Sequence, residues 1–539
     1  MASILGLAST DGRMLRRIHR ERPGGAGIDV IISDDPDAPV LGAAENLEIP
    51  TEVIELDPVD ASTSIDRTIR TVVAEYNIDL VCLDEYVGTI PQELLAAMPP
   101  IFDVHYSLLP SFPGSDPVSA ALESGVSITG STVYLVVDQG GVARDVPIVT
   151  QEPVPVYQDD STDRLQNRIR GDAAEPAYLR ATRWFATDNI VLETAVDGQI
   201  DISIADDAES PLPQRRIASS DRIESLRYGE NPHQAAALYR DRPAEEPSVV
   251  GATQVGGDRA MSYVNYVDAA GALDLVLEFD RPAAAVIKHA NPAGCAVDED
   301  LSVAYERALS TDPMSAFGGV VALNRPCDTD TARSIVSSVK HVIVAPGYGD
   351  EALDVLGQRE SMRILDVSGG EPRPIGPDDR SIGLVERSVI GGRLVQDRDR
   401  HRLDAEECEV VTTREPTADE RAAMMFAWPV VKHATSNAIA LASGSETVGI
   451  GIGQVSRVDA VRIATLKADE HAEGKSADGA VLASDAFFPF PDGIELAAAA
   501  GVSAVIQPGG SMRDEEVIAA AEANDMAMIF TGIRSFRHK

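Results

Sequence analysis

Residues 283–294 read AAAVIKHANPAG, and this segment gives the clearest indication of fold class in the chain. Its five leading apolar residues predict a buried strand, which delivers Lys288 and His289 to its end, just before a turn at Asn291 and Pro292. Proteins of the α/β class place their chemistry at such strand ends. A lysine beside a histidine sets a fixed cation next to a group that titrates near neutral pH. The alternative is a lysine that extends into solvent beside a surface histidine.

Short apolar segments alternate with amphipathic ones through most of the chain, which indicates the α/β class. Strands are predicted at residues 28–32, 80–83 and 132–137. A helix is predicted at 64–76, where apolar residues recur at helical spacing.

The length of the chain implies more than one domain. It has 539 residues, and at about 150 residues per domain it should form at least two. A stretch rich in Asp, Ser and Pro at 197–213 interrupts the alternation of strands and helices. We therefore expect one domain at 1–195, a linker at 196–216 and a second domain at 217–539.

The net charge of −40 comes from 86 acidic and 46 basic residues and disfavours nucleic acid and membrane surfaces as partners. The acidic residues are spread along the chain, and only six of the basic residues are lysines. This pattern is typical of a protein adapted to high salt, as in haloarchaea, where screening shortens the Debye length to about 3 Å. An ordinary acidic protein is the alternative. In so lysine-poor a chain, a lysine within an apolar run is a candidate functional residue.

The four cysteines lie far apart and form no C-x-x-C pair, which argues against a disulfide framework or a structural zinc site. The apolar start of the chain has no basic segment before it, and no run of 18 apolar residues occurs. We expect a soluble cytoplasmic protein with no signal peptide and no membrane span.

Further segments of the second half combine polar side chains with turns. Arg227, Tyr228, Asn231 and His233 share the turn at 226–234, and such convergent donors suit an anionic substrate. The loop at 312–319 ends in two glycines, which allow close approach to a ligand. The G-x-G-x-G run beginning at residue 449 has no third glycine opening a helix, so it is not a dinucleotide-binding fingerprint.

These segments resemble the aminoimidazole carboxamide ribotide (AICAR) transformylase family of purine biosynthesis, in the family's order and over about residues 215–539. The segments that carry the resemblance are 227–234, 288–294, 312–319, 432–437, 449–457, 484–493 and 536–538. It implies two similar α/β/α halves of cytidine-deaminase type without zinc. The sequence has no H-x-E with a C-x-x-C partner, as a zinc deaminase would require. The resemblance also implies a homodimer with active sites at the subunit interface.

The reaction that this resemblance implies is transfer of a formyl group from the co-substrate 10-formyltetrahydrofolate to the 5-amino group of AICAR. A ribotide and a folate are therefore the expected small-molecule partners. In that family the domain usually follows an inosinate cyclohydrolase domain. No part of this sequence resembles one, so a cyclohydrolase step is not expected.

The resemblance also implies a role for each candidate site residue. The acceptor amine is a weak nucleophile, so His289 is the expected general base, and Lys288 would stabilise the oxyanion and protonate the folate nitrogen. Asn437 would hold the carboxamide or the formyl oxygen. The candidate ribotide contacts are Arg227, Tyr228, Asn231, His233, Arg457, Arg534 and His538. The candidate folate contacts are Phe487, Asp492 and Ser315, and a K⁺ site is implied near Ser436 and Asp485.

Residues 101–114, IFDVHYSLLPSFPG, resemble the folate-dependent formyltransferases, and specifically glycinamide ribotide transformylase. The likeness covers about residues 1–195 and implies a Rossmann-like sheet. Of the family's Asn, His and Asp triad, His105 matches the histidine and Asp145 the aspartate, and Leu108 is a candidate folate contact. The asparagine position holds Asp103, and an ionised carboxylate cannot donate to an oxyanion unless it is protonated.

Two other segments of the first domain are more acidic than the family pattern. The phosphate loop at 8–13 contains Asp11, and the strand end at 83–86 reads LDEY. Two alternatives follow. The first domain either formylates glycinamide ribotide, which would make the chain bifunctional, or it is a non-catalytic docking or dimerisation module.

Overall fold

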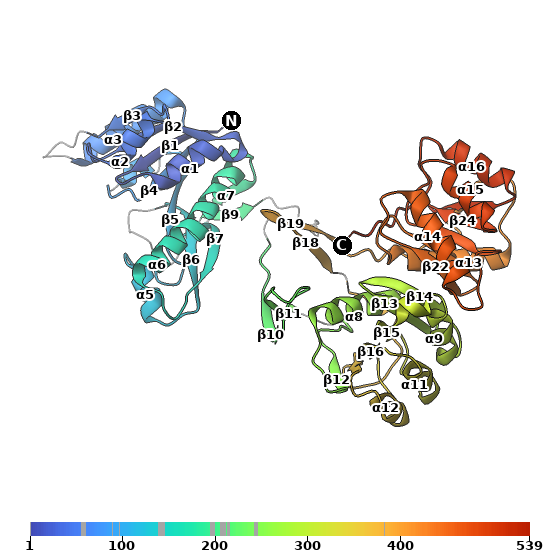
Figure 1. Ribbon diagram of the computed structural model, residues 1–539. Coiled ribbons are helices and arrows are strands. Elements are labelled where there is room, and N and C mark those ends of the chain that lie inside the picture. Colours follow the sequence, from blue (N-terminus) through green and yellow to red (C-terminus); the bar gives the residue numbers. More distant parts are fainter. Residues whose placement is uncertain are drawn as a thin grey trace. The chain divides into compact units, whose positions relative to one another are not determined.

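Two units make up the chain in the computed structural model, residues 1–215 and 216–539 (Figure 1). The structure describes residues 2–54, 61–88, 90–95, 97–137, 146–194, 200–204, 212, 216–241, 246–381 and 383–538. Most of the expected linker, 196–216, lies outside the described residues, and the domain boundaries drawn from the sequence stay a prediction.

A seven-stranded sheet with the order β3-β2-β1-β4-β5-β6-β7 forms the centre of the first unit. The strands from β3 to β5 are parallel, and β6 and β7 are antiparallel. The strands are β1 (Ser3–Ala8), β2 (Gly27–Ser33), β3 (Thr51–Val53), β4 (Leu80–Asp84), β5 (Ile101–His105), β6 (Ile128–Leu135) and β7 (Ile148–Pro155). The chain order reverses between β1 and β4, so a crevice forms at the carboxyl ends of these two strands.

Helices cover both faces of this sheet. On one face α1 and α7 pack against Ile4 and Ala8 of β1, and on the other α3 packs against Leu5 and Leu7. The helices are α1 (Arg13–Glu21), α2 (Pro39–Glu45), α3 (Ala61–Tyr76), α4 (Gln92–Leu95), α5 (Pro117–Glu123), α6 (Thr162–Arg168) and α7 (Glu175–Ala186). A hairpin of β8 (Ile190–Thr194) and β9 (Ile200–Ile204) follows. The predicted Rossmann-like class is confirmed, and the predicted strands and helix appear as β2, β4, β6 and α3.

A twelve-stranded sheet forms the centre of the second unit, with the order β12-β17-β16-β15-β13-β14-β22-β21-β23-β24-β25-β20. The strands of its first half are β12 (Thr253–Gly256), β13 (Ala283–Lys288), β14 (Asn291–Val297), β15 (Val320–Leu323), β16 (Val342–Ala345) and β17 (Arg363–Asp366). Those of its second half are β20 (Glu409–Val410), β21 (Ile439–Ser443), β22 (Glu446–Gly451), β23 (Val481–Ser484), β24 (Ala504–Gln507) and β25 (Ala527–Phe530).

The two halves of this sheet have the same arrangement. In each, an antiparallel hairpin (β13 with β14, or β21 with β22) is followed by three parallel strands. The halves meet where β14 pairs with β22 through Ala296 and Glu446. The predicted pair of similar α/β/α halves is therefore confirmed, although the sequence shows no recognisable repeat.

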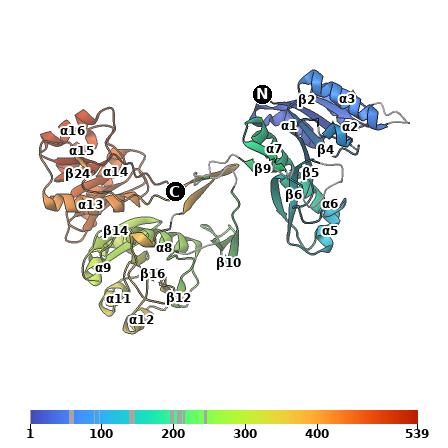
Figure 2. The same cartoon turned by 180° about the vertical axis from the view of Figure 1, so that it is seen from behind.

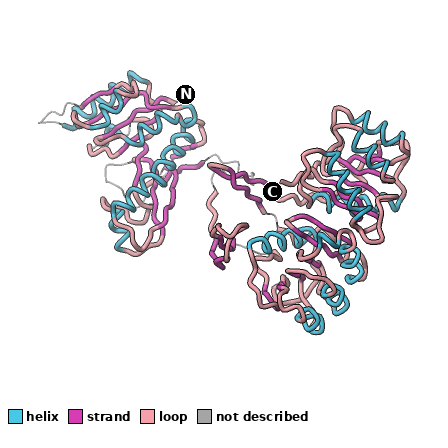
Figure 3. Tube along the Cα trace, in the orientation of Figure 1, coloured by secondary structure: helices cyan, strands magenta, loops and turns pink. Residues whose placement is uncertain are grey.

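Helices lie on both sides of the strands, as Figure 3 shows by colour. One apolar core contains residues of α8 and α13 and runs under both halves, while the opposite face carries separate cores for each half. Figure 2 shows α9, α11 and α12 grouped together on the first half. The helices are α8 (Tyr263–Val276), α9 (Leu301–Leu309), α10 (Pro313–Ala316), α11 (Thr329–Val336), α12 (Asp350–Gly357), α13 (Ala418–Lys432), α14 (Arg457–Glu470), α15 (Asp492–Ala499) and α16 (Asp514–Ala523).

Capping residues fix where the two helices of the shared core begin. Ser262 and Asn265 form a capping box at α8, and Thr417 and Glu420 form one at α13. Two smaller hairpins complete the unit: β10 (Ser220–Leu226) with β11 (Ala236–Asp241), and β18 (Leu384–Val389) with β19 (Gly392–Asp397). Across the described residues, no helix is long and apolar enough to span a membrane.

Candidate active site

The Lys288 and His289 pair lies at the tight turn between β13 and β14. His289 and Ala290 both adopt the left-handed backbone region, with φ of 54° and 56°. The Lys288 ammonium donates a hydrogen bond to the carbonyl of Phe317 over 2.9 Å. The amide of Ala290 donates to Asp268 Oδ1 over 2.6 Å. Lys288 is therefore held at the sheet end by a backbone acceptor rather than extended freely into solvent.

Asn291 connects this turn to the second half of the unit. Its side-chain nitrogen donates to the carbonyl of His289 over 3.1 Å, and its oxygen accepts from the amide of Thr435 over 2.9 Å. Thr435 lies in the segment that leads from α13 to Asn437 and β21. Two motifs that the sequence offered separately are thus brought into one cluster.

Asn437 is held entirely by protein groups. Its oxygen accepts from Arg457 Nη2 over 2.7 Å, and its nitrogen donates to the carbonyls of Gln454 and Val455 over 2.9 and 3.0 Å. Both amide hydrogens are therefore in use, and only the oxygen keeps a lone pair for a ligand. Asn437 can accept a hydrogen bond from the substrate's carboxamide, but in this arrangement it cannot donate one to the formyl oxygen.

Asp485 and Arg457 form a buried ion pair beside Asn437. Arg457 also donates to the carbonyl of Ala438 over 3.0 Å, so its guanidinium is committed to the protein. Ser436 Oγ donates to Asp485 Oδ2 over 2.5 Å. These two oxygens are bonded to each other and Arg457 pairs with the carboxylate, so both have protein partners, and the K⁺ expected near them stays a prediction.

The C-terminal segment packs on this cluster. Ser436 donates its amide to the carbonyl of Arg537, and Arg537 donates its amide to Ser436 Oγ, both over 3.0 Å. The guanidinium of Arg534 lies 4.7 Å from the ring centre of Phe536, which meets His538 edge-on at 5.6 Å. Arg534 and His538 therefore lie on the segment whose Arg537 is bonded to Ser436.

The turn at 227–234 lies on the separate β10 and β11 hairpin, and its bonds run between its own residues. Asn231 donates to Gln234 from both its backbone and side-chain nitrogens, and the guanidinium of Arg227 lies 5.7 Å from the ring centre of Tyr228. Arg227, Asn231 and His233 are exposed. These contacts do not place the turn beside Lys288 or Asn437.

Of the candidate folate contacts in the second unit, Ser315 lies close in sequence to the residue that holds Lys288. Ser315 lies in α10, where its amide donates to Asp312 Oδ1 over 2.9 Å, two residues before the Phe317 carbonyl that holds Lys288. Phe487 is 39% exposed and Asp492 begins α15. An exposed ring and a carboxylate are suited to stacking and hydrogen bonding with a pterin.

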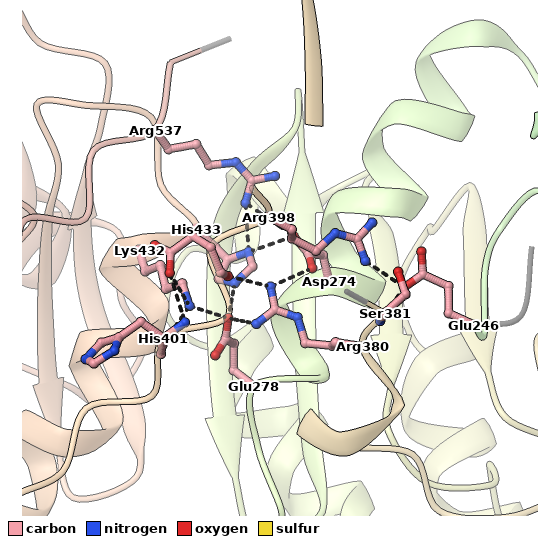
Figure 4. Close-up of polar contacts among 11 residues, drawn as sticks. Glu246, Asp274, Glu278, Arg380, Ser381, Arg398, His401, Lys432, His433 and Arg537 are labelled. Atoms are coloured by element: carbon pink, nitrogen blue, oxygen red, sulfur yellow. Dashed lines mark hydrogen bonds and ion pairs between the residues drawn. The ribbon is translucent and has the colours of Figure 1, made fainter. Parts of the chain in front are cut away.

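A buried charge network lies behind this cluster, where the two halves of the unit meet (Figure 4). Glu278 of α8 accepts from His433 over 2.7 Å and Arg380 over 2.6 Å, and Lys432 lies 3.2 Å away. Burial raises the pKa of Glu278, but the hydrogen bond from His433 and the nearby cations outweigh it, so the pKa lies below its usual value. The carboxylate of Asp274 behaves in the same way.

In the first unit, Asp103 and His105 point to the same face of β5, since they are two residues apart on a strand. Asp103 accepts from the hydroxyl of Tyr134 over 2.6 Å and from the amide of Val104 over 2.8 Å. Burial, opposed by these two hydrogen bonds, raises the pKa of Asp103 to about 6. His105 donates from Nε2 to the carbonyl of Phe112 over 2.9 Å, and burial lowers its pKa. Asp145 lies outside the described residues.

A cavity of about 270 Å³ occupies the crevice at the carboxyl ends of β1 and β4. The charged residues that line it are Asp11, Asp84, Glu85 and Glu175, with Arg13 and Arg170. Asp84 accepts from the amides of Met14 and Leu15 at the start of α1, over 2.8 and 3.4 Å. A carboxylate of the chain therefore takes the helix-terminus amides that a phosphate would use. Burial raises the pKa of Asp84 to about 7.

Comparison with known families finds two family models that match this chain. The family model described as the AICARFT/IMPCHase bienzyme matches residues 160–467, and the model described as formyl transferase matches residues 3–182. The chain belongs to the AICARFT/IMPCHase bienzyme family. Its first unit additionally carries a formyl transferase domain, as the resemblance implied.

Curated members of the bienzyme family give the same result. The bifunctional purine biosynthesis protein PurH of Roseobacter denitrificans is 45% identical over 390 residues, 71% of this chain and 69% of that protein. PurH of Magnetococcus marinus is 48% identical over 334 residues, 61% of this chain and 62% of that protein. Among solved structures, phosphoribosylglycinamide formyltransferase from Anaplasma phagocytophilum is 28% identical over 39% of this chain and 97% of its own, with a TM-score of 0.34. Glycinamide ribonucleotide transformylase 1 from Symbiobacterium toebii is 32% identical over 38% of this chain and 94% of its own, with a TM-score of 0.33.

The expectation that a cyclohydrolase step is absent is wrong. The matching family is the bienzyme, and the curated relatives are each named bifunctional. The expectation rested on the absence of any segment that resembles a cyclohydrolase domain, whereas the bienzyme model matches from residue 160, inside the first unit.

The sequence did not reveal several residues of the network in the bienzyme's second unit. Asp274, Glu278 and Arg380 stood in no motif, because they join only through the fold. Lys432 and His433 were the available signals, since Lys432 is one of six lysines in the chain and both lie in the segment 432–437 that carries the resemblance. Asp84 was visible only as extra acidity at a strand end.

Proposed function

We propose that the second unit transfers the formyl group of 10-formyltetrahydrofolate to the 5-amino group of AICAR, giving the formylated ribotide. The observation that supports this most directly is the hydrogen bond from Thr435 to Asn291. It joins the Lys288 and His289 turn to the segment that carries Asn437. Membership in the AICARFT/IMPCHase bienzyme family supports the same reaction.

In this proposal the amine nitrogen attacks the formyl carbon, and the new carbon–nitrogen bond forms as the amine gives a proton to His289. Lys288, anchored by the Phe317 carbonyl, stabilises the negative charge that develops on the formyl oxygen. The bond from the formyl carbon to the folate nitrogen then breaks, and Lys288 protonates that nitrogen. Proton exchange with solvent restores both residues. Asn437 accepts from the carboxamide and orients the ribotide.

The experiment is a steady-state assay of the full-length protein with AICAR and 10-formyltetrahydrofolate, in molar KCl, with the formylated product measured by mass spectrometry. Absence of product would overturn the proposal. As a member of the bienzyme family, the chain is also proposed to close this product to inosinate, so the same reaction followed to inosinate measures both steps.

We propose a homodimer in which the turn carrying Arg227, Tyr228, Asn231 and His233 completes the partner's site. This proposal is supported by the exposure of Arg227, Asn231 and His233 and by the hydrogen bonds that join Asn231 to Gln234 within the turn. Complementation tests it, because an inactive Arg227→Ala protein mixed with an inactive His289→Ala protein should regain activity. A mixture that stays inactive while subunits exchange would contradict it.

For the first unit we propose two alternatives: formyl transfer to glycinamide ribotide, or a non-catalytic docking or dimerisation role. The formyl transferase match and His105 on β5 support the first. The carboxylates of Asp103 and Asp84 support the second, since neither suits its expected ligand when ionised. If both units are active, His105→Ala should abolish only glycinamide ribotide formylation and His289→Ala only AICAR formylation.

We further propose that the protein works in the cytoplasm of a salt-adapted cell, without nucleic acid or membrane partners. The net charge of −40 and the scarcity of lysine support this setting.

A further inference from the structure

His433 stands where the charge network meets the C-terminal segment, and its two ring nitrogens have different partners (Figure 4). Nε2 lies 2.7 Å from the carboxylate of Glu278, which can only accept, so Nε2 carries a proton. Nδ1 lies 2.7 Å from Arg537 Nη1, and a guanidinium can only donate, so Nδ1 is bare. These contacts fit an imidazole that donates through Nε2 and accepts at Nδ1, and its side chain is 2% exposed.

Arg537 carries this contact forward to the candidate site. Its guanidinium lies 2.7 Å from His433 Nδ1 and 3.7 Å from Asp274 Oδ2, and its backbone exchanges two hydrogen bonds of 3.0 Å with Ser436. Ser436 is bonded directly to Asn437, whose oxygen faces the ribotide in the proposed function. His538, a candidate ribotide contact, follows Arg537. A shift of the guanidinium would therefore move both residues.

His433 Nδ1 has a second neighbour, an acceptor, besides Arg537. Asp274 Oδ2 lies 3.5 Å from the same nitrogen. A proton on Nδ1 would remove the acceptor that Arg537 uses, place two cations together, and turn the ring toward Asp274. The charged groups that face His433 are Asp274 and Glu278 of α8, Lys432 of α13, Arg380, Arg398 and Asp399 of the segment between the halves, and Arg537.

We propose that neutral His433 is a positioning residue for the formyl transfer: it holds Arg537, and Arg537 holds the Ser436–Asn437 peptide in the active site. The proposal rests on the proposed function. His433 touches neither substrate nor the reacting atoms, so its effect should appear in kcat through the geometry of the bound ribotide.

Substitution by glutamine separates this role from bulk packing. In His433→Gln the amide nitrogen can still donate to Glu278 and the oxygen can still accept from Arg537, whereas His433→Leu makes neither bond. We expect His433→Leu to lower kcat for AICAR formylation about 10- to 100-fold, and His433→Gln to stay within about threefold of wild type. Arg462→Met, at an exposed arginine of α14, is the matched control for Arg537→Met.

Variants of Arg537 test whether His433 acts through this arginine. Arg537→Met should lower kcat about as much as His433→Leu, and the double variant should be no slower than either, because both break one link.

A spectroscopic readout tests the contact without any assay. Nitrogen NMR of the imidazole, assigned by its loss in His433→Gln, should report a proton on Nε2 and none on Nδ1 at neutral pH. The opposite tautomer overturns the proposal. So does a wild type that formylates AICAR while the leucine and glutamine variants share its kcat. If wild type forms no product, the proposed function fails and the positioning role falls with it, whatever the tautomer.

Discussion

Asn291 Oδ1 accepts a hydrogen bond from the amide of Thr435 over 2.9 Å, although 144 residues separate them. One half of the second unit supplies the Lys288 and His289 turn, and the other supplies Asn437 and Arg457. The bond sets the distance between the proposed base and the residue that orients the acceptor. Proposed catalysis in the second unit therefore depends on the docking of its two halves.

Replacing Lys288 or His289 by alanine should nearly abolish AICAR formylation, because the proposed base or the oxyanion cation is lost. Steady-state rates measure this, and circular dichroism checks folding. His401→Ala, at an exposed histidine of the same unit, serves as the control. If both variants keep more than about a tenth of the rate, a loss below about 1.4 kcal/mol, the assignment is wrong.

Asn291→Ala should lower kcat for AICAR about 10- to 100-fold while the unit stays folded, since the two segments would no longer be held in register. Asn291→Asp keeps the oxygen that accepts from Thr435 and should be less damaging. Rates for both variants at saturating substrate make the comparison. Equal rates in the two variants would contradict a role in catalysis for the hydrogen bond from Thr435 to Asn291.

The first unit should formylate glycinamide ribotide better in acid than at neutral pH. The pKa of Asp103 is raised to about 6, so below that pH the side chain carries the proton needed to donate to an oxyanion. His105 stays neutral into acid because burial lowers its pKa. Asp103→Asn should raise the neutral rate and flatten the acid dependence, with one lost donor worth about 3–4 kcal/mol. A wild type fully active at neutral pH and unchanged by Asp103→Asn would refute this account.

The pH dependence of stability in the first unit should include a contribution from Asp84. Its folded pKa of about 7 lies above the value near 3.9 of an unfolded aspartate. The folded state therefore binds the extra proton, and this stability is present below about pH 4 and lost as the pH rises to 7. Asp84→Asn should raise the melting temperature at pH 8 more than at pH 4. Calorimetry of the full chain measures this, with Glu123→Gln, at an exposed acid of the same unit, as the control.

The whole chain should be more stable in molar KCl than in dilute buffer, because a charge of −40 repels itself when screening is weak. Thermal unfolding across a KCl series measures the effect, and sucrose of equal osmotic strength separates screening from solvent exclusion. A melting temperature that is flat or falls with salt would contradict the high-salt interpretation.

The local parts of this structure were readable from the sequence, and the long-range contacts were not. The apolar run at 283–287 predicted β13 and the placement of Lys288 at its end, because a buried strand has a short-range signature. The network around Glu278 had no such signature, since its partners Arg380 and His433 lie 102 and 155 residues away. The hydrogen bond from the Met14 amide, at the start of α1, to Asp84 likewise joins residues 70 positions apart. The cyclohydrolase expectation failed for a different reason, since absence of a recognised motif is weak evidence of absence.

The strand order of the second unit reads the same from either end, so its halves are related by an approximate two-fold axis between β14 and β22. Such an axis generates two equivalent places, one at each hairpin turn. At the β13 turn the chain carries Lys288 and His289. At the β21 turn it carries Gly444 and Ser445, and the hydroxyl of Ser445 donates a hydrogen bond to the carbonyl of Val297. The scaffold is therefore symmetric while the two turns are not: one carries the proposed catalytic pair, and the other ties the two halves together.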